Sequence, residues 1–478
     1  MSQQLLFIIL FSLFSSFNGF KFIPRMSSAL HASSNDGILN DVVTSLPASQ
    51  DISPISSDPW WSQDSADLRF KCTGCGRCCL NDGEVWMDGG EFNEVADFMN
   101  ISLATLMDDY TDMISGGWAK MKNYVSPITN QDKCIFLAED NKECTIYSVR
   151  PNQCRTYPWW PRLLFNDSNW KEEACVPDDT KDGKKWSAET GGCEGINHVD
   201  ATTVDLLKIS RNFELSSLYT KFGPTPSIMT QDEERSKFLQ KTEIMKAVTK
   251  STRVWVKDFV VKYNLCPFAE GVLTSSTIRY QVFLGKHDLE QIIEFIKFEM
   301  LHLLTTPEEE ISTTLIMLPF AFQDFAEFND FSIELEDEIV PAFEKESRPA
   351  YTVKNADGDG FEKQAGKESK LKKLFSKRKS KSSGECPLSR GKEDDEEIQI
   401  AAFHPAFQYS DTELNDPLNF EKRSPFPTIN LLRAAKIREY ANEGKTAKIA
   451  VNNVESLMAV GGETLLMELQ RIINIALD

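Results

Sequence analysis

Residues 72–79 read CTGCGRCC and place four cysteines within eight positions, spaced C-x2-C-x2-C-C. Cysteines at C-x2-C spacing can bring two sulfurs onto one tetrahedral zinc ion, and C-x2-C-x2-C runs also hold iron–sulfur clusters. Gly74 and Gly76 lie between the cysteines and would let the backbone turn tightly and point amide groups at sulfur. The residue types and their spacing therefore predict a sulfur-rich metal site at this turn.

Later cysteines extend the set of possible ligands. Cys134, Cys144 and Cys154 follow at equal ten-residue steps, and two more cysteines come before residue 200. Because only His198 lies near them in sequence, the donors are almost all soft sulfurs, which favours zinc or iron over magnesium or calcium. The candidate metal ligands are Cys72, Cys75, Cys78, Cys79, Cys134, Cys144, Cys154, Cys175 and Cys193.

Nine thiols leave the number of metal ions open. Four ligands per site allow two sites with one thiol left over, or one site beside structural or redox-active cysteines. Adjacent Cys78 and Cys79 are not expected to bind one ion in a simple knuckle, because their side chains should diverge. Disulfide bonds are the alternative, and they would suit a small secreted domain in an oxidising compartment.

Three stretches, CTGCGRCC, DKCIFLA and ECTIYSVRPNQCRTYP, occur in this order. Together they resemble the YkgJ-type cysteine-cluster family, over roughly residues 68–200. The resemblance implies a zinc- or iron-chelating domain and implies no particular reaction. The shared C-x-I-Y-x-x-R-P-x-x-C-R pattern consists of Cys144, Ile146, Tyr147, Arg150, Pro151, Cys154 and Arg155.

Polar residues in the second half of the chain lie near predicted strand ends, where α/β sheets bind ligands. His404 lies at the end of a predicted strand, directly before Pro405, and is a candidate acid, base or ligand; a hydrogen-bonded, half-buried histidine is the alternative. Cys266 is a candidate nucleophile, with a buried small apolar residue as the alternative. Asn419 and Ser424 lie in similar places.

Three arginines suggest an anion site in the same half. Arg279, Arg423 and Arg433 could surround a phosphate or carboxylate, to which guanidinium groups pair well. A helix predicted to follow Pro425 could point its N-terminus at the same anion, near Ser424. Scattered surface arginines are the alternative.

The elements that must position the cysteines are short. DGGEFNEVADFMN and SLATLMDDY show helical spacing of apolar residues, with Ser102 as an N-cap. EVWMD, AKMKNYVSP and DKCIFLA are typical of short strands. These pieces predict a small α+β shell with little core of its own, which a metal or a disulfide would stabilise.

The second half alternates between strands and helices, which predicts an α/β sandwich with right-handed crossovers. The predicted fold class is therefore α+β: a small metal-stapled cysteine-rich domain followed by an α/β sandwich domain. NLCPFA and NFEKRSPFPTINLLR in this half resemble a family of bacterial and plastid domains of unknown function. The predicted strands cover 277–285, 312–322 and 398–407, and the predicted helices cover 252–264, 288–304, 324–345, 424–441 and 463–477.

The N-terminus has the pattern of a targeting segment. LLFIILFSLF is an apolar run of signal-peptide length, and a basic, serine-rich stretch follows it. This order predicts import into a plastid, with secretion as the alternative. The predicted organisation is a presequence (1–34), a linker (35–67), the cysteine-rich domain (68–200), a connector (201–251) and the α/β domain (252–478) with a disordered, charge-rich insertion at 347–397.

The composition indicates which kinds of partner the chain should not attract by charge or enter by apolarity. A net charge of −20 gives the chain no general attraction to nucleic acid or to anionic membranes, and no stretch after residue 20 has the length and apolarity of a membrane helix. No Walker loop, GxGxxG, HExxH or serine nucleophile elbow occurs. We therefore expect a metal-binding protein that chelates zinc or iron, with an iron–sulfur cluster as one form, and whose α/β domain binds an anionic small molecule. The alternatives are a metal-dependent or redox enzyme and a secreted disulfide-stapled protein.

Overall fold

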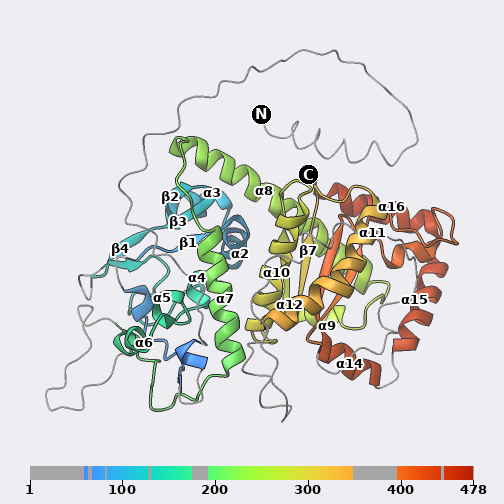
Figure 1. Cartoon of the computed structure of the whole chain (residues 1–478). Coiled ribbons are helices and arrows are strands. Elements are labelled where there is room, and N and C mark those ends of the chain that lie inside the picture. Colours follow the sequence, from blue (N-terminus) through green and yellow to red (C-terminus); the bar gives the residue numbers. More distant parts are fainter. Residues whose placement is uncertain are drawn as a thin grey trace, which may run out of the picture. The chain divides into compact units, whose positions relative to one another are not determined.

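The computed structural model describes residues 59–62, 67–80, 83–127, 130, 132–174, 192–347, 396–442 and 446–476. The chain divides into two compact units, one formed by Met1–Ala66 with Leu477 and the other by Asp67–Ala476 with Asp478. All elements below belong to the second unit (Figure 1). The predicted presequence, and most of the predicted linker and insertion, lie outside the described residues.

Two small antiparallel sheets begin the second unit. The first has the order β1-β3-β2 and the second pairs β4 with β5. Helix α2 (Gly89–Met99) starts at Asp88, which forms a capping box with Glu91, and α3 (Leu103–Thr105) starts at Ser102 as predicted. The strands are β1 (Trp86–Met87), β2 (Thr111–Ser115), β3 (Trp118–Met121), β4 (Asn123–Val125) and β5 (Asp132–Cys134).

Short helical segments lie before, between and after these strands, and two of them carry cysteines. They are η2 (Arg77–Cys79), η3 (Leu106–Tyr110), η4 (Tyr147–Val149), α4 (Asn152–Arg155), α5 (Pro161–Leu164) and α6 (Asp167–Glu173). The cysteine-rich region has a larger core than the sequence predicted, because Phe92, Met107 and Ile114 pack together and Phe238 joins them. Phe238 belongs to α8 (Gln231–Trp255), so a helix beyond the predicted domain completes this core.

The predicted connector is mostly helical. It contains α7 (Leu206–Phe222) and most of α8, which begins with a capping box formed by Thr230 and Glu233. Helix α8 continues without a break into η6 (Val256–Val261), a π-helical turn. Position 252, the predicted start of the α/β domain, therefore lies inside a continuous helix.

A four-stranded sheet forms the centre of the second half, in the order β6-β7-β9-β8. Strands β6 (Ile278–Val282) and β7 (Thr313–Met317) are parallel and are joined by α10 (Leu289–Thr305), whose N-cap is Asp288 as predicted. Strand β9 (Thr428–Arg433) runs antiparallel to both β7 and β8 (Ile398–Phe403).

The predicted helix over 424–441 is wrong in its first half. Residues 428–433 form β9, and the helix α14 (Ala434–Asn442) begins only afterwards. Strand β9 lies between two partners, and its β-branched Thr428 and Ile429 are buried. Backbone pairing on both sides and burial outweigh the helical propensity of the leucines and alanines that follow. No helix therefore starts directly at Pro425, where the predicted helix would begin.

Helices cover both faces of this sheet, as the alternation along β7 shows. Ile316 packs in a cluster with residues of α7, α10, α11 (Phe325–Glu334) and α12 (Val340–Ser347). Leu315 and Met317 pack in a cluster with residues of α8, α15 (Thr446–Val460) and α16 (Gly462–Asn474). The two clusters confirm an α/β sandwich within an α+β chain (Figure 1). The second half also contains α9 (Ala269–Thr274), η7 (Leu335–Ile339) and η10 (Pro417–Glu421).

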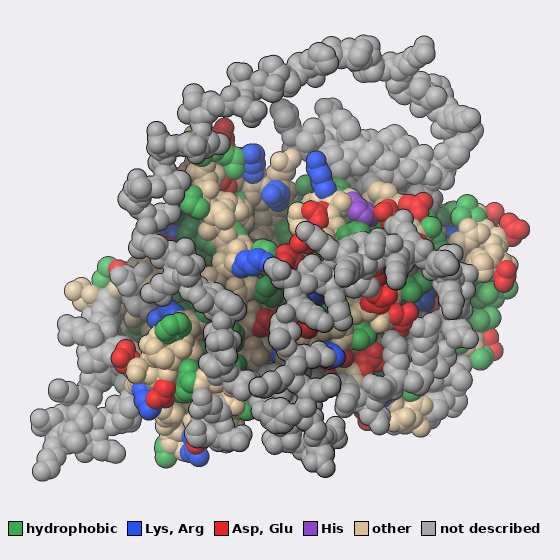
Figure 2. Space-filling view, viewed as in Figure 1, with side chains coloured by type: hydrophobic (Ala, Val, Ile, Leu, Met, Phe, Trp, Pro, Cys, Tyr) green, Lys and Arg blue, Asp and Glu red, His purple; other side chains and the backbone are tan. Residues whose placement is uncertain are grey.

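Acidic side chains are prominent on the described surface in Figure 2, in keeping with the net charge of −20. Lysines and arginines lie among them over the face shown. Within the described ranges, no helix has both the length and the apolarity needed to cross a bilayer.

Candidate metal centre

The CTGCGRCC segment forms a tight turn that depends on its glycines. Gly74 has φ 66° and Gly76 has φ 72°, both in the left-handed region that side chains disfavour. A Cβ atom on Gly76 would lie 2.2 Å from the backbone oxygen of Asn141, whereas one on Gly74 would meet nothing within 4 Å. Gly76 therefore allows the cysteine turn to lie directly against the loop that connects Cys134 with Cys144.

That loop brings two more cysteines close to each other. Cys134 ends β5, and Cys144 forms an isolated antiparallel bridge with Leu137. The backbone amide of Thr145 donates to the oxygen of Phe136 at 2.8 Å, which closes the loop. Cys79, Cys134 and Cys144 all pack against the core that contains Phe92. Sulfurs from two distant parts of the sequence thus share one side of the domain.

Cys154 lies on the short helix α4. The backbone amide of Asn152, at the start of this helix, donates to Oε1 of Glu91 at 2.7 Å. Glu91 is 4% exposed, and burial raises its pKa well above the usual range. The capping-box spacing of Asp88 and Glu91 predicts that Glu91 folds back onto its own helix, but nothing in the sequence indicates that it also holds the helix of Cys154.

The adjacent thiols Cys78 and Cys79 do not diverge as the sequence suggested. Their Sγ atoms lie 3.9 Å apart within the 3-10 turn η2. The contact between them lowers the pKa of Cys78 and raises that of Cys79, because one thiol stabilises the thiolate of the other. The turn therefore places two sulfurs on the same side of the backbone.

Five thiols influence one another electrostatically, and we call Cys78, Cys79, Cys134, Cys144 and Cys154 the five-thiol group. Burial raises the pKa of Cys134 to about 11 and that of Cys154 well above its usual range, and negative charge on neighbouring cysteines adds to both shifts. Burial also raises the pKa of Cys144. In the described part of the chain, no three metal-binding side chains converge closely enough to hold an ion without moving.

The other predicted ligands have different neighbours. Cys72 is exposed and interacts with the Tyr147 hydroxyl, and Cys193 is buried, with its amide donating to the backbone oxygen of Glu173. Cys75 is half-buried near Cys193. Cys175 lies outside the described residues, and all nine cysteines that the structure describes are free thiols.

His404 occupies the strand end as predicted, but it is buried. Its Nε2 lies 2.9 Å from the backbone oxygen of Phe322, and its Nδ1 accepts from the amide of Ala406 at 3.0 Å. Both ring nitrogens are thus engaged in a neutral tautomer, and burial lowers the pKa of this histidine. The contacts match the alternative of a hydrogen-bonded structural histidine, and the side chain is only 2% exposed.

The three predicted anion-binding arginines have separate internal partners. Arg279 pairs with Glu94 and Glu299, at 2.6 and 2.8 Å. Arg423 donates to the backbone oxygens of Phe407 and Leu414. The third, Arg433, donates to backbone oxygens at the C-terminal end of α10 and in the turn after it, those of Leu303, Thr306 and Ile311. The guanidinium groups therefore stabilise the fold, and these contacts give no support to a shared anion pocket.

The remaining predicted site residues of the second half either donate hydrogen bonds within the fold or are shielded from solvent. Ser424 donates to the backbone oxygen of Phe426 at 2.6 Å, and Asn419 donates to the backbone oxygen of Glu413. Burial raises the pKa of Cys266, which disfavours the thiolate that a nucleophile needs.

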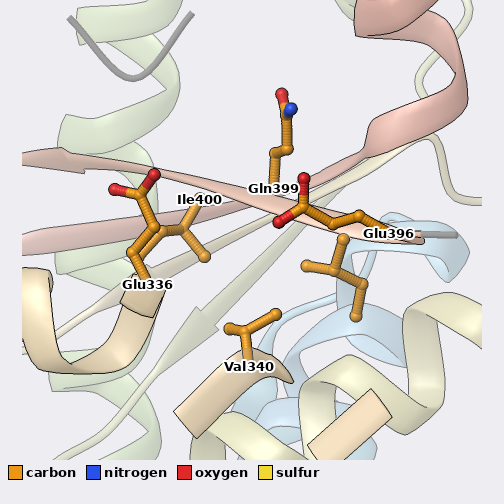
Figure 3. A pocket seen from close by; sticks show the side chains of 6 residues that line it. Glu336, Val340, Glu396, Gln399 and Ile400 are labelled. Atoms are coloured by element: carbon orange, nitrogen blue, oxygen red, sulfur yellow. The ribbon is translucent and has the colours of Figure 1, made fainter. Parts of the chain in front are cut away.

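A pocket lies beside β8, and none of the predicted site residues belongs to its lining. Figure 3 shows Glu336 beside Ile400, with Glu396 across the pocket from Glu336 and Val340 below them. Its lining contains neither cysteine nor histidine.

Two family models match the chain in the order that the sequence motifs predicted. Residues 71–176 match the CxxCxxCC family, whose description is "Putative zinc- or iron-chelating domain", and residues 247–348 and 387–466 match DUF1415, a "Protein of unknown function". The chain carries a CxxCxxCC domain followed by a DUF1415 domain. The predicted family resemblance is thereby confirmed. The five-thiol group lies wholly within the CxxCxxCC domain.

One relative extends this comparison. Over 92 residues the chain is 27% identical to "Uncharacterized protein MJ0661" of Methanocaldococcus jannaschii, and the aligned region covers 19% of this chain and 46% of that protein. The chain thus spans about half the length of the curated relative that it matches. No solved structure matches the chain.

Proposed function

We propose that this protein binds a thiophilic metal ion, zinc or iron, through cysteines of the CxxCxxCC domain. The observation that carries the proposal is the 3.9 Å separation of Cys78 Sγ and Cys79 Sγ. Sulfur ligands at about 2.3 Å from a tetrahedral ion are about 3.8 Å from each other. The two adjacent thiols therefore have the spacing of two corners of such a site.

The surroundings of these thiols support the same function. Cys134, Cys144 and Cys154 are drawn from three separate stretches into one largely buried region, where their raised pKa values keep them protonated in the absence of a cation. A bound cation would replace these protons and offset the charge of neighbouring thiolates, so that metal binding releases protons and stabilises the fold. Rotation of these side chains would supply the third and fourth ligands.

Basic residues near the group fit an anionic metal–thiolate centre. Arg150 stacks on Tyr147, with its guanidinium carbon 3.8 Å from the ring centre, and its charge favours the thiolate of Cys78. Arg155 follows Cys154 directly. A bound zinc ion would supply structural cross-linking, whereas an iron–sulfur cluster would supply one-electron chemistry.

Metal analysis tests the proposal on the full chain, purified without oxygen. Stoichiometric zinc in a colourless protein would assign a structural site, and iron with sulfide and absorbance near ~400 nm would assign a cluster. Either result supports the proposal. The Cys78→Ser/Cys79→Ser variant should lose the metal, and Cys266→Ser, a matched change in the DUF1415 domain, should retain it. Protein without stoichiometric zinc or iron would contradict the proposal.

A further inference from the structure

The helix that carries Cys154 is held at both ends by contacts outside the five-thiol group. At its start, the amide of Asn152 donates to Glu91 Oε1 at 2.7 Å, and Glu91 Oε2 accepts from the amide of Asp88 at 3.1 Å. Glu91 is 4% exposed, so this link is shielded from water. The start of α4 is thereby fixed to the start of α2.

At its other end, the same helix reaches the DUF1415 domain. Arg155 Nη1 donates to Glu310 Oε2 at 2.8 Å, while its Nη2 donates to the backbone oxygen of Ser148 at 3.1 Å. The Arg155 side chain is 11% exposed and that of Glu310 is 37% exposed, so the pair is partly shielded from water. Glu310 belongs to the turn between α10 and β7, where its amide donates to the oxygen of Pro307.

A second set of contacts leads from α2 to the same part of the DUF1415 domain. Glu94 Oε1 accepts from Arg279 Nη1 at 2.6 Å and from Gln281 Nε2 at 2.9 Å, both on β6. Arg279 in turn donates from Nε to Glu299 Oε2 on α10 at 2.8 Å. The link through Glu91 and α2 therefore leads to β6 and α10. The link through Arg155 leads to the turn that follows α10.

We propose that metal binding by the five-thiol group is coupled to the α10–β7 turn of the DUF1415 domain, with Arg155 as the positioning residue that links them. This inference rests on the proposed metal-binding function. Cys154 and Arg155 are neighbours on a helix of four residues, so a metal bond that fixes the first also fixes the backbone of the second. A fixed Arg155 loses less entropy on pairing with Glu310.

Coupling of this kind is reciprocal. If metal binding strengthens the Arg155–Glu310 pair, then removing the pair must weaken metal binding by the same factor. The turn offers a matched control, because Glu308 pairs with Lys436 inside the DUF1415 domain, whereas Glu310 pairs with Arg155 of the CxxCxxCC domain. Glu310→Gln and Glu308→Gln therefore make the same chemical change two residues apart, with different expected results.

Hydrogen–deuterium exchange of the full chain, with and without zinc chloride, tests the coupling. Zinc should slow exchange of the backbone amides at 306–312 about threefold or more in the unmodified chain and in Glu308→Gln, and should have no such effect in Glu310→Gln. Zinc affinity, measured by competition with a chromogenic chelator, should fall about two- to tenfold in Glu310→Gln only. Exchange within α16 serves as the internal reference.

The outcomes separate this inference from the function on which it rests. Stoichiometric zinc binding with unchanged exchange at 306–312 would overturn the coupling and leave the proposed function in place. Equal effects of the two glutamine variants would also overturn it, since a general loss of negative charge would then explain both. A chain that binds neither zinc nor iron would overturn both proposals. If Glu310→Gln does not fold, Arg155→Lys replaces it in the comparison with Glu308→Gln. Lysine retains the positive charge, but it lacks the two guanidinium nitrogens that donate to Glu310 and to the Ser148 oxygen.

Discussion

Cys78 Sγ and Cys79 Sγ lie 3.9 Å apart, on the same side of a 3-10 turn. This separation is far longer than a disulfide bond of about 2.05 Å, and it is close to the sulfur–sulfur distance around a tetrahedral ion. Adjacent cysteines on an extended backbone would point to opposite sides. The turn that starts at Gly76 removes that divergence and makes the pair suitable for one ion.

The glycine turn gives a paired prediction. Gly76→Ala should weaken metal binding and lower the free energy of unfolding more than Gly74→Ala does, although both residues have positive φ. The new methyl group at Gly76 would lie 2.2 Å from the oxygen of Asn141, whereas the one at Gly74 has open space. Gly74→Ala should cost about 1 kcal/mol from backbone strain alone. Chemical denaturation of both variants, together with their metal contents, checks this difference. Equal losses of unfolding free energy and of metal in the two variants would contradict the prediction.

Part of this site could be predicted from the sequence and part could not. Cysteine spacing and the C-x-I-Y-x-x-R-P-x-x-C-R pattern predicted the correct domain, because ligand spacing is local information. The approach of Cys154 to Cys134 depends on Glu91, which holds the helix of Cys154 from another element. Such a contact between residues 61 positions apart in the chain leaves no periodicity in the sequence.

The buried Arg279 should be essential for stability. Arg279→Met would leave Glu299, which is 1% exposed, and Glu94 without their shared cation. Loss of one partner from a buried ion pair typically destabilises a protein by about 3–5 kcal/mol. Lys436→Met, which removes an exposed partner of Glu308, should cost less than about 1 kcal/mol. Thermal unfolding of the two variants compares them directly, and similar small losses would contradict the assigned role of Arg279.

The arginines also show where reasoning from residue types is incomplete. Arg279, Arg423 and Arg433 were predicted to bind an anion together, and each instead satisfies carboxylates or carbonyl oxygens within the fold. A sequence shows that a guanidinium is present but not whether its donors are already used. The same holds for the strand β9, whose pairing partners on both sides decide its conformation.

Acid should destabilise the chain through His302. This residue of α10 is 1% exposed, and burial, together with the positive charges of Arg279 and Arg155, lowers its pKa well below the usual value. A lowered pKa means that the unfolded chain takes up a proton that the folded chain does not, so stability is present above about pH 6.5 and lost below it. Between pH 6.5 and 5 the free energy of unfolding should fall by about 2 kcal/mol from this group.

A His302→Leu variant isolates this effect. Its stability should depend less on pH between 6.5 and 5 than that of the unmodified chain, as measured by urea denaturation across this range. Nδ1 of His302 has no hydrogen-bond partner among the described residues, so the substitution breaks no such bond at that atom. An unchanged pH dependence would show that His302 is not responsible.

X-ray absorption at the metal edge of the anaerobically purified full chain identifies the atoms bound to the metal and so tests whether cysteines hold it. We predict a first shell dominated by sulfur at about 2.3 Å, reduced or lost in the Cys78→Ser/Cys79→Ser variant. A first shell of nitrogen and oxygen alone, or a spectrum that the double variant leaves unchanged, would contradict it.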